Sequence, residues 1–111
     1  MRKKRIVILG STGSIGTRTL EVIASLPGRF EVVGLTGKKE IDILERQIRE
    51  YQPKLVAVLE GAEELEKRVR GRDVKVLSGE EGLMEVAKYK EADLVVSAIM
   101  GAPSLLLTLE A

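Results

Sequence analysis

The sequence predicts an α/β fold in which helices cover both faces of a parallel sheet of about five strands. Short runs rich in valine, isoleucine and leucine alternate with charged segments whose apolar residues recur every three or four positions. A glycine-rich turn follows the first apolar run directly. Right-handed crossovers between parallel strands place helices over the sheet. The expected strand order is 3-2-1-4-5, with a ligand crevice at the carboxyl ends of strands one and four.

Each expected strand is a short apolar run. The runs are residues 6–9, 30–35, 55–59, 74–77 and 94–98. The first is continuous and β-branched for most of its length, which is typical of a central strand buried on both faces. Pro27-Gly28, Pro53 and Gly71 end the helical segments that separate the first four runs.

Four helices are expected between these strands, the first over residues 14–26 and the third over residues 61–70. In chain order, the residues expected to face inward are Ile15, Thr19, Val22, Ile23 and Leu26, then Ile41, Leu44, Ile48 and Tyr51, then Ala62, Leu65 and Val69, then Leu83, Val86 and Ala87. Ser78 and Glu81 fit a capping box at the start of the fourth helix.

The last apolar segment, residues 105–109, is expected to form a further helix that begins near Pro103. Because this helix would be apolar almost all round, it must pack against another surface. We therefore expect self-association through this C-terminal helix.

Composition narrows the classes of function. A chain of 111 residues is expected to form a single domain over residues 1–111, and a net charge of +1 speaks against binding to nucleic acid or to an anionic membrane. The absence of cysteine and histidine removes thiol nucleophiles, the commonest general base and the commonest transition-metal ligand. No apolar run approaches the roughly 20 residues of a membrane span, so a cytoplasmic location is expected.

The strongest motif is the segment Gly10-Ser11-Thr12-Gly13-Ser14-Ile15-Gly16, between the first strand and the first helix. Glycines allow a tight turn and the close approach of a phosphate, while the first helical N–H groups and the helix dipole favour an anion. The hydroxyls of Ser11, Thr12 and Ser14 can donate to phosphate oxygens. The sequence thus predicts a phosphate site, and the alternative is a tight turn without a ligand.

The end of the second strand indicates which dinucleotide would bind. NAD-binding domains place an acid there for the ribose hydroxyls, whereas a cation accommodates the 2′-phosphate of NADP. Here Thr36-Gly37-Lys38-Lys39 contains no acid before Glu40. This favours NADP(H) over NAD(H), and the alternative is two solvated lysines in a loop.

Several segments resemble the amino-terminal part of the 1-deoxy-D-xylulose 5-phosphate reductoisomerase family. They are residues 8–16 followed by Thr19-Leu20, residues 30–35 followed by Gly37-Lys38, and residues 53–54, 56–58, 77–79 and 97–102. Because the segments occur in the same order as in the family, the resemblance spans the whole chain and is far more specific than the glycine turn alone.

The resemblance implies a Rossmann-like NADP(H)-binding domain. In this family the full enzyme uses NADPH and a divalent cation to rearrange and reduce 1-deoxy-D-xylulose 5-phosphate to 2-C-methyl-D-erythritol 4-phosphate, in the non-mevalonate isoprenoid pathway. By match of motif, the implied pyrophosphate ligands are Thr12, Gly13, Ser14 and Ile15. Gly37, Lys38 and Lys39 would hold the phosphorylated ribose, and Ile99 would lie near the nicotinamide.

Two departures from the family pattern matter. Lys39 stands where the family usually has asparagine, which adds a charge beside the ribose site. The family's metal-binding carboxylates and substrate-phosphate ligands lie beyond Ala111, so no catalytic or metal-ligating residue is predicted. The domain alone is expected to bind NADPH without turning over substrate.

Two alternatives are the cofactor domain of another NADP-dependent oxidoreductase, such as a semialdehyde dehydrogenase, and an engineered Rossmann scaffold without activity.

Overall fold

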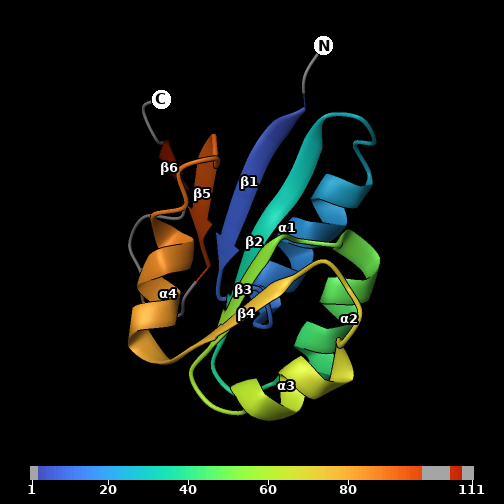
Figure 1. Cartoon of the computed structure of the whole chain (residues 1–111). Coiled ribbons are helices and arrows are strands. Elements are labelled where there is room, and N and C mark those ends of the chain that lie inside the picture. Colours follow the sequence, from blue (N-terminus) through green and yellow to red (C-terminus); the bar gives the residue numbers. More distant parts are fainter. Residues whose placement is uncertain (1–2, 99–105, 109–111) are drawn as a thin grey trace.

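The computed structural model describes residues 3–98 and 106–108. A sheet with the order β4-β3-β2-β1-β5-β6 runs through this part of the chain (Figure 1). Its strands are β1 (Lys4–Leu9), β2 (Phe30–Gly37), β3 (Leu55–Val58), β4 (Lys75–Ser78), β5 (Leu94–Ser97) and β6 (Leu106–Thr108). The pairs among β1 to β5 are parallel, and β6 runs antiparallel to β5.

The described helices are α1 (Ser14–Ala24), α2 (Ile41–Tyr51), α3 (Ala62–Arg68) and α4 (Gly79–Ala87). Helices α1, α2 and α3 pack on one face of the sheet, where Leu20, Leu44 and Leu65 join Ile8 and Val56 in one core cluster. Helix α4 covers the other face, as Figure 1 shows, and its Val86 packs in the second core cluster. The predicted α/β fold with helices on both faces is confirmed.

The predicted strand order is wrong in one respect. The order of the parallel strands is 4-3-2-1-5, so β4 pairs with β3 at the edge and β5 takes the place beside β1. Helix α3 packs on the same face as α1 and α2, so the right-handed crossover from β3 to β4 continues in the same direction. Helix α4 then returns the chain across the opposite face to β5. The reversal of strand order therefore lies between β1 and β5, not between β1 and β4.

The predicted buried face of α1 is also wrong, although Ile23 is buried as expected. The helix buries Gly16, Leu20 and Ile23, while Ile15, Val22 and Leu26 are 42%, 54% and 38% exposed. A Cβ built on Gly16 would lie 2.3 Å from the Gly10 carbonyl oxygen, so only glycine lets α1 come this close to the preceding turn. This backbone contact turns the apolar stripe away from the sheet.

The inward residues predicted for the other three helices are buried or partly buried. Ser78 is the N-cap of α4, as predicted, but its side chain makes no capping hydrogen bond, so the capping box is not formed. No described helix combines the length and the apolar character needed to cross a bilayer.

The predicted C-terminal helix is wrong where the structure describes that segment. Leu106–Thr108 is a strand, paired with β5 through Val96, Val95 and Leu94. The backbone hydrogen bonds of sheet pairing outweigh the helical preference of a leucine run. The expected self-association depended on an apolar helix, and Leu106–Thr108 is not helical. The predicted turn around Pro103 lies outside the described residues.

Candidate functional site

The turn between β1 and α1 is held against the end of β2 by hydrogen bonds that its backbone N–H groups donate to Thr36. Gly10 adopts φ 77°, a left-handed conformation that glycine reaches without strain. Its N–H donates to Thr36 Oγ1 at 2.8 Å, and the Ser11 N–H donates to the Thr36 carbonyl at 2.8 Å. The position of the turn is thus set by the neighbouring strand rather than by a ligand.

Ser11 anchors the turn from beneath. Its side chain is fully buried, and its hydroxyl donates to Gln47 Oε1 at 2.7 Å. The amide of Gln47 donates back to the Ser11 carbonyl at 2.8 Å. The expectation that the Ser11 hydroxyl faces a phosphate is therefore corrected, because that hydroxyl is already used inside the protein.

The amino end of α1 offers free backbone donors. Gly13 is its N-cap, with an extended backbone and no side chain to cap the helix, and the first turn holds no acidic residue. The first N–H groups of a helix have no intrahelical partners, so those of Ser14, Ile15 and Gly16 are left for an anion. The other three described helices all carry acids in their first turns.

The end of β2 lies beside this turn. Gly37 approaches Thr12 closely, since a Cβ on Gly37 would meet the two terminal atoms of the Thr12 side chain at 3.2 and 3.3 Å. Lys38 and Lys39 follow and are both exposed. The predicted phosphate turn and the predicted ribose turn are thus brought into contact.

A pocket of about 350 Å³ opens between these segments. Its lining residues are Gly10, Thr12, Gly13, Thr36, Gly37, Lys38, Glu40, Leu59, Leu83 and Ala98. Of the predicted site residues, Gly10, Thr12, Gly13, Gly37 and Lys38 line it directly. Ser14, Ile15 and Lys39 are exposed and do not line it, Ser11 lies buried behind the turn, and Ile99 lies outside the described residues.

Sequence reasoning missed the remaining lining residues and Gln47. Leu59, Leu83 and Ala98 come from the ends of β3 and β5 and from α4, so only the sheet topology brings them together. Gln47 did carry a signal, because it lies on the inward face of α2 between Leu44 and Ile48. A polar residue at such a position predicts a buried hydrogen-bond partner.

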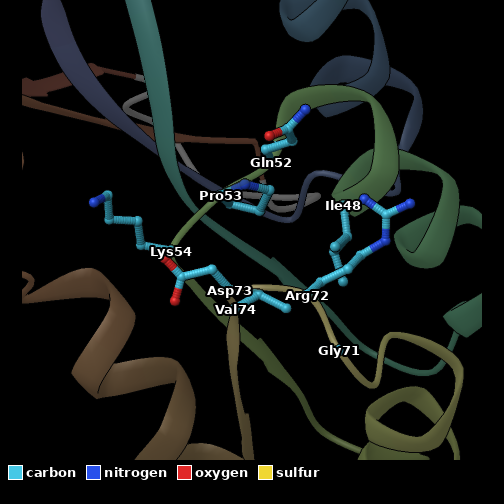
Figure 2. Close-up of a pocket in the computed structure, with 8 residues that line it drawn as sticks. All are labelled: Ile48, Gln52, Pro53, Lys54, Gly71, Arg72, Asp73 and Val74. Carbon is cyan, nitrogen blue, oxygen red and sulfur yellow. The ribbon is translucent and has the colours of Figure 1, made fainter.

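A separate hollow of about 430 Å³ lies at the other end of the sheet (Figure 2). It is formed by the carboxyl end of α2 and by the segments that lead into β3 and β4. Figure 2 shows the Lys54 ammonium and the Arg72 guanidinium at opposite sides of this hollow, so the two cations do not converge on one anion. Ligands of open α/β sheets bind at the carboxyl ends of the strands, which favours the pocket beside Gly13.

Within residues 3–98 and 106–108, no group of three acidic side chains could hold a metal ion.

A parallel sheet, a glycine turn that opens into an uncapped helix, and a pocket at the carboxyl ends of the strands together define a Rossmann-like domain of the dinucleotide-binding class. A family model described as 1-deoxy-D-xylulose 5-phosphate reductoisomerase matches residues 6–111, and the chain belongs to this family.

Curated relatives carry the same description. The 1-deoxy-D-xylulose 5-phosphate reductoisomerase of Thermodesulfovibrio yellowstonii is 49% identical over 110 residues. That of Caldanaerobacter subterraneus subsp. tengcongensis is 49% identical over 111 residues. Each match covers 97% of this chain and 28% of the relative, so the chain spans little more than a quarter of the length of these enzymes.

Solved structures share the fold. A crystal structure of DOX-P reductoisomerase in complex with NADPH, fosmidomycin and magnesium has a TM-score of 0.83 and 37% sequence identity. That match covers 86% of this chain and 24% of the other. The reductoisomerase from Zymomonas mobilis in complex with NADPH has a TM-score of 0.82 and 27% identity, covering 87% of this chain and 26% of the other.

Proposed function

We propose that this chain binds NADP(H) in the pocket between the β1–α1 turn and the end of β2. The observation that carries the proposal is that Gly13 and Lys38 line the same pocket. Gly13 is the N-cap of α1, whose first turn has no side-chain cap and no acidic residue. The pyrophosphate would lie against Thr12, Gly13, Ser14 and Ile15, where the helix dipole and the free N–H groups favour negative charge.

Lys38 would receive the 2′-phosphate of the adenosine ribose. Among the described residues that line the pocket, Lys38 is the only cation. A charge-assisted hydrogen bond to phosphate contributes about 1.5–3 kcal/mol. Lys39 follows it and would add attraction at longer range. Ile99 would lie toward the nicotinamide, beyond Ala98 at the carboxyl end of β5.

We propose further that the complete enzyme rearranges and reduces 1-deoxy-D-xylulose 5-phosphate to 2-C-methyl-D-erythritol 4-phosphate with NADPH and a divalent cation. NADPH supplies the hydride for that reduction, and the residues named above bind and orient it. The cytoplasmic location predicted from the sequence belongs to the same proposal, since a reductase must lie where NADPH is available. Family membership favours this activity over that of a semialdehyde dehydrogenase.

Calorimetric titration of the chain with NADPH and with NADH tests the cofactor proposal. We expect Lys38→Ala to weaken NADPH binding about tenfold and to change NADH binding little, because only NADPH carries the 2′-phosphate. Lys39→Ala is the matched control and should have a smaller effect, since Lys39 does not line the pocket. Equal losses for the two cofactors would remove the role of Lys38, and no binding of either cofactor would favour an inactive scaffold.

A further inference from the structure

Glu40 stands at the edge of the candidate pocket, between the two segments that carry its predicted phosphate-binding groups. Its side chain lines the pocket together with Thr12 and Lys38. Its Oε1 atom accepts a hydrogen bond from the Thr12 hydroxyl at 3.1 Å and one from the Lys39 amide at 3.4 Å. The carboxylate therefore bridges the turn after β1 and the end of β2.

The groups around this carboxylate stabilise negative charge. Partial burial raises the pKa of Glu40, but hydrogen bonds from the Lys39 backbone and the Thr12 hydroxyl, together with the backbone of Glu40 and Lys38, outweigh it. The net effect is a pKa below the usual value. Because the side chain is largely exposed, these donors rather than tight packing hold it in place. The same donors would suit a phosphate oxygen.

We propose that Glu40 is a specificity-determining residue that competes with the 2′-phosphate of NADP(H) for the place beside Lys38 and for the amide of Lys39. This inference rests on the proposed function. A phosphate seated beside Lys38 would meet a like charge, so the carboxylate must leave Thr12 and Lys39 when the phosphate binds. The 2′-hydroxyl of NAD(H) is uncharged and can donate to the carboxylate. Glu40 thus reduces the preference for NADP(H) that Lys38 creates.

Glu40→Gln isolates the charge, since it keeps the length of the side chain. Titration calorimetry would compare the parent chain and this variant with two pairs of ligands, NADPH with NADH and adenosine 2′,5′-bisphosphate with AMP. In each pair the members differ only in the 2′-phosphate. We expect Glu40→Gln to bind the two 2′-phosphorylated ligands about tenfold more tightly. The affinities for NADH and AMP should stay the same or fall.

Glu31→Gln is the charge-matched control, because Glu31 is exposed at the opposite end of β2. It should leave all four affinities within about twofold of the parent values. If Lys38→Ala weakens NADPH binding but Glu40→Gln binds it no more tightly than the parent, the role of Glu40 is overturned and the proposed function stands. An equal gain for all four ligands would also overturn that role, since it would reflect relieved crowding. If neither the parent nor Glu40→Gln binds NADPH, both proposals are overturned.

Discussion

Gly13, the N-cap of α1, and Gly16, in the first turn of that helix, have different surroundings. A Cβ on Gly16 would lie 2.3 Å from the Gly10 carbonyl oxygen and 2.6 Å from Ser11 Cα, so the backbone would have to move. Around a Cβ on Gly13, the only contact within 4 Å that the described part of the chain provides is the Gly10 carbonyl oxygen, at 3.7 Å. The extended backbone of Gly13, with φ −79° and ψ 176°, is one that alanine adopts readily. Gly16 is therefore required for packing, whereas Gly13 borders the pocket and leaves room for a methyl group.

We expect Gly13→Ala to leave the free energy of unfolding within about 1 kcal/mol of the parent value. The same variant should bind NADPH at least about tenfold more weakly, because a methyl group hinders the close approach of the pyrophosphate. Gly16→Ala should instead lower the free energy of unfolding by about 3 kcal/mol, since backbone atoms cannot make room by changing rotamer. Urea unfolding and calorimetric titration measure the two effects separately. Full NADPH affinity in Gly13→Ala would contradict the pyrophosphate site.

At the scale of elements, α2 positions both the β1–α1 turn and α1, the two parts of the proposed phosphate site. Its Gln47 holds Ser11 in the turn through two hydrogen bonds of 2.7 and 2.8 Å. Its last residue, Tyr51, donates from its hydroxyl to the Leu20 carbonyl of α1 at 3.2 Å. Burial, with Glu50 and Glu21 nearby, raises the pKa of Tyr51, so this hydroxyl keeps its proton and remains a donor at neutral pH. Helix α2 thus fixes the turn and α1 relative to each other.

We expect Tyr51→Phe to lower the free energy of unfolding by about 0.5–1.5 kcal/mol, the usual net contribution of one hydrogen bond. Tyr89→Phe is the matched control, because Tyr89 is also partly buried but its hydroxyl makes no hydrogen bond within the described residues. That control should change stability by less than about 0.5 kcal/mol. Thermal and urea unfolding of the two variants provide the comparison, and equal losses would show that ring packing, not the hydrogen bond to α1, is what matters.

Local patterns were sufficient to predict the four described helices and the five parallel strands. They did not predict which face of α1 is buried, nor the strand β6. The periodicity of Leu44, Ile48 and Tyr51 identified both α2 and its buried side. In α1 the same reasoning selected Ile15 and Val22, which are exposed, because a backbone contact at Gly16 decides how the helix packs. The strand at 106–108 depends on pairing with β5, which no short-range pattern reveals.

At the scale of the whole molecule, strand order decides what lines the site. The fourth strand could pair with β1, as predicted, or with β3, as observed. Both arrangements fit the same alternation of strands and helices, so the sequence pattern could not distinguish them. The observed order places β5 beside β1, which brings Ala98 to the pocket that Gly10 and Gly13 begin. The glycine turn and Lys38 were predictable because each lies in a continuous motif. Leu59 and Leu83 were not, since they join the pocket only through the fold.

Binding of NADPH should stabilise the folded chain as a whole. A ligand that binds only the folded state at 100 times its dissociation constant adds about 2.7 kcal/mol to the free energy of unfolding. For a domain of this size, 1 kcal/mol corresponds to about 4 °C in Tm, so saturating NADPH should raise Tm by about 10 °C. At the same NADPH concentration, the rise in Tm should be smaller for Lys38→Ala than for the parent chain. With NADH, the rises in Tm of the parent and of this variant should differ much less. Calorimetric scans over a series of NADPH concentrations measure the shift. A Tm that does not change with NADPH would mean that the uncapped end of α1 holds no cofactor, whatever the likeness of the fold.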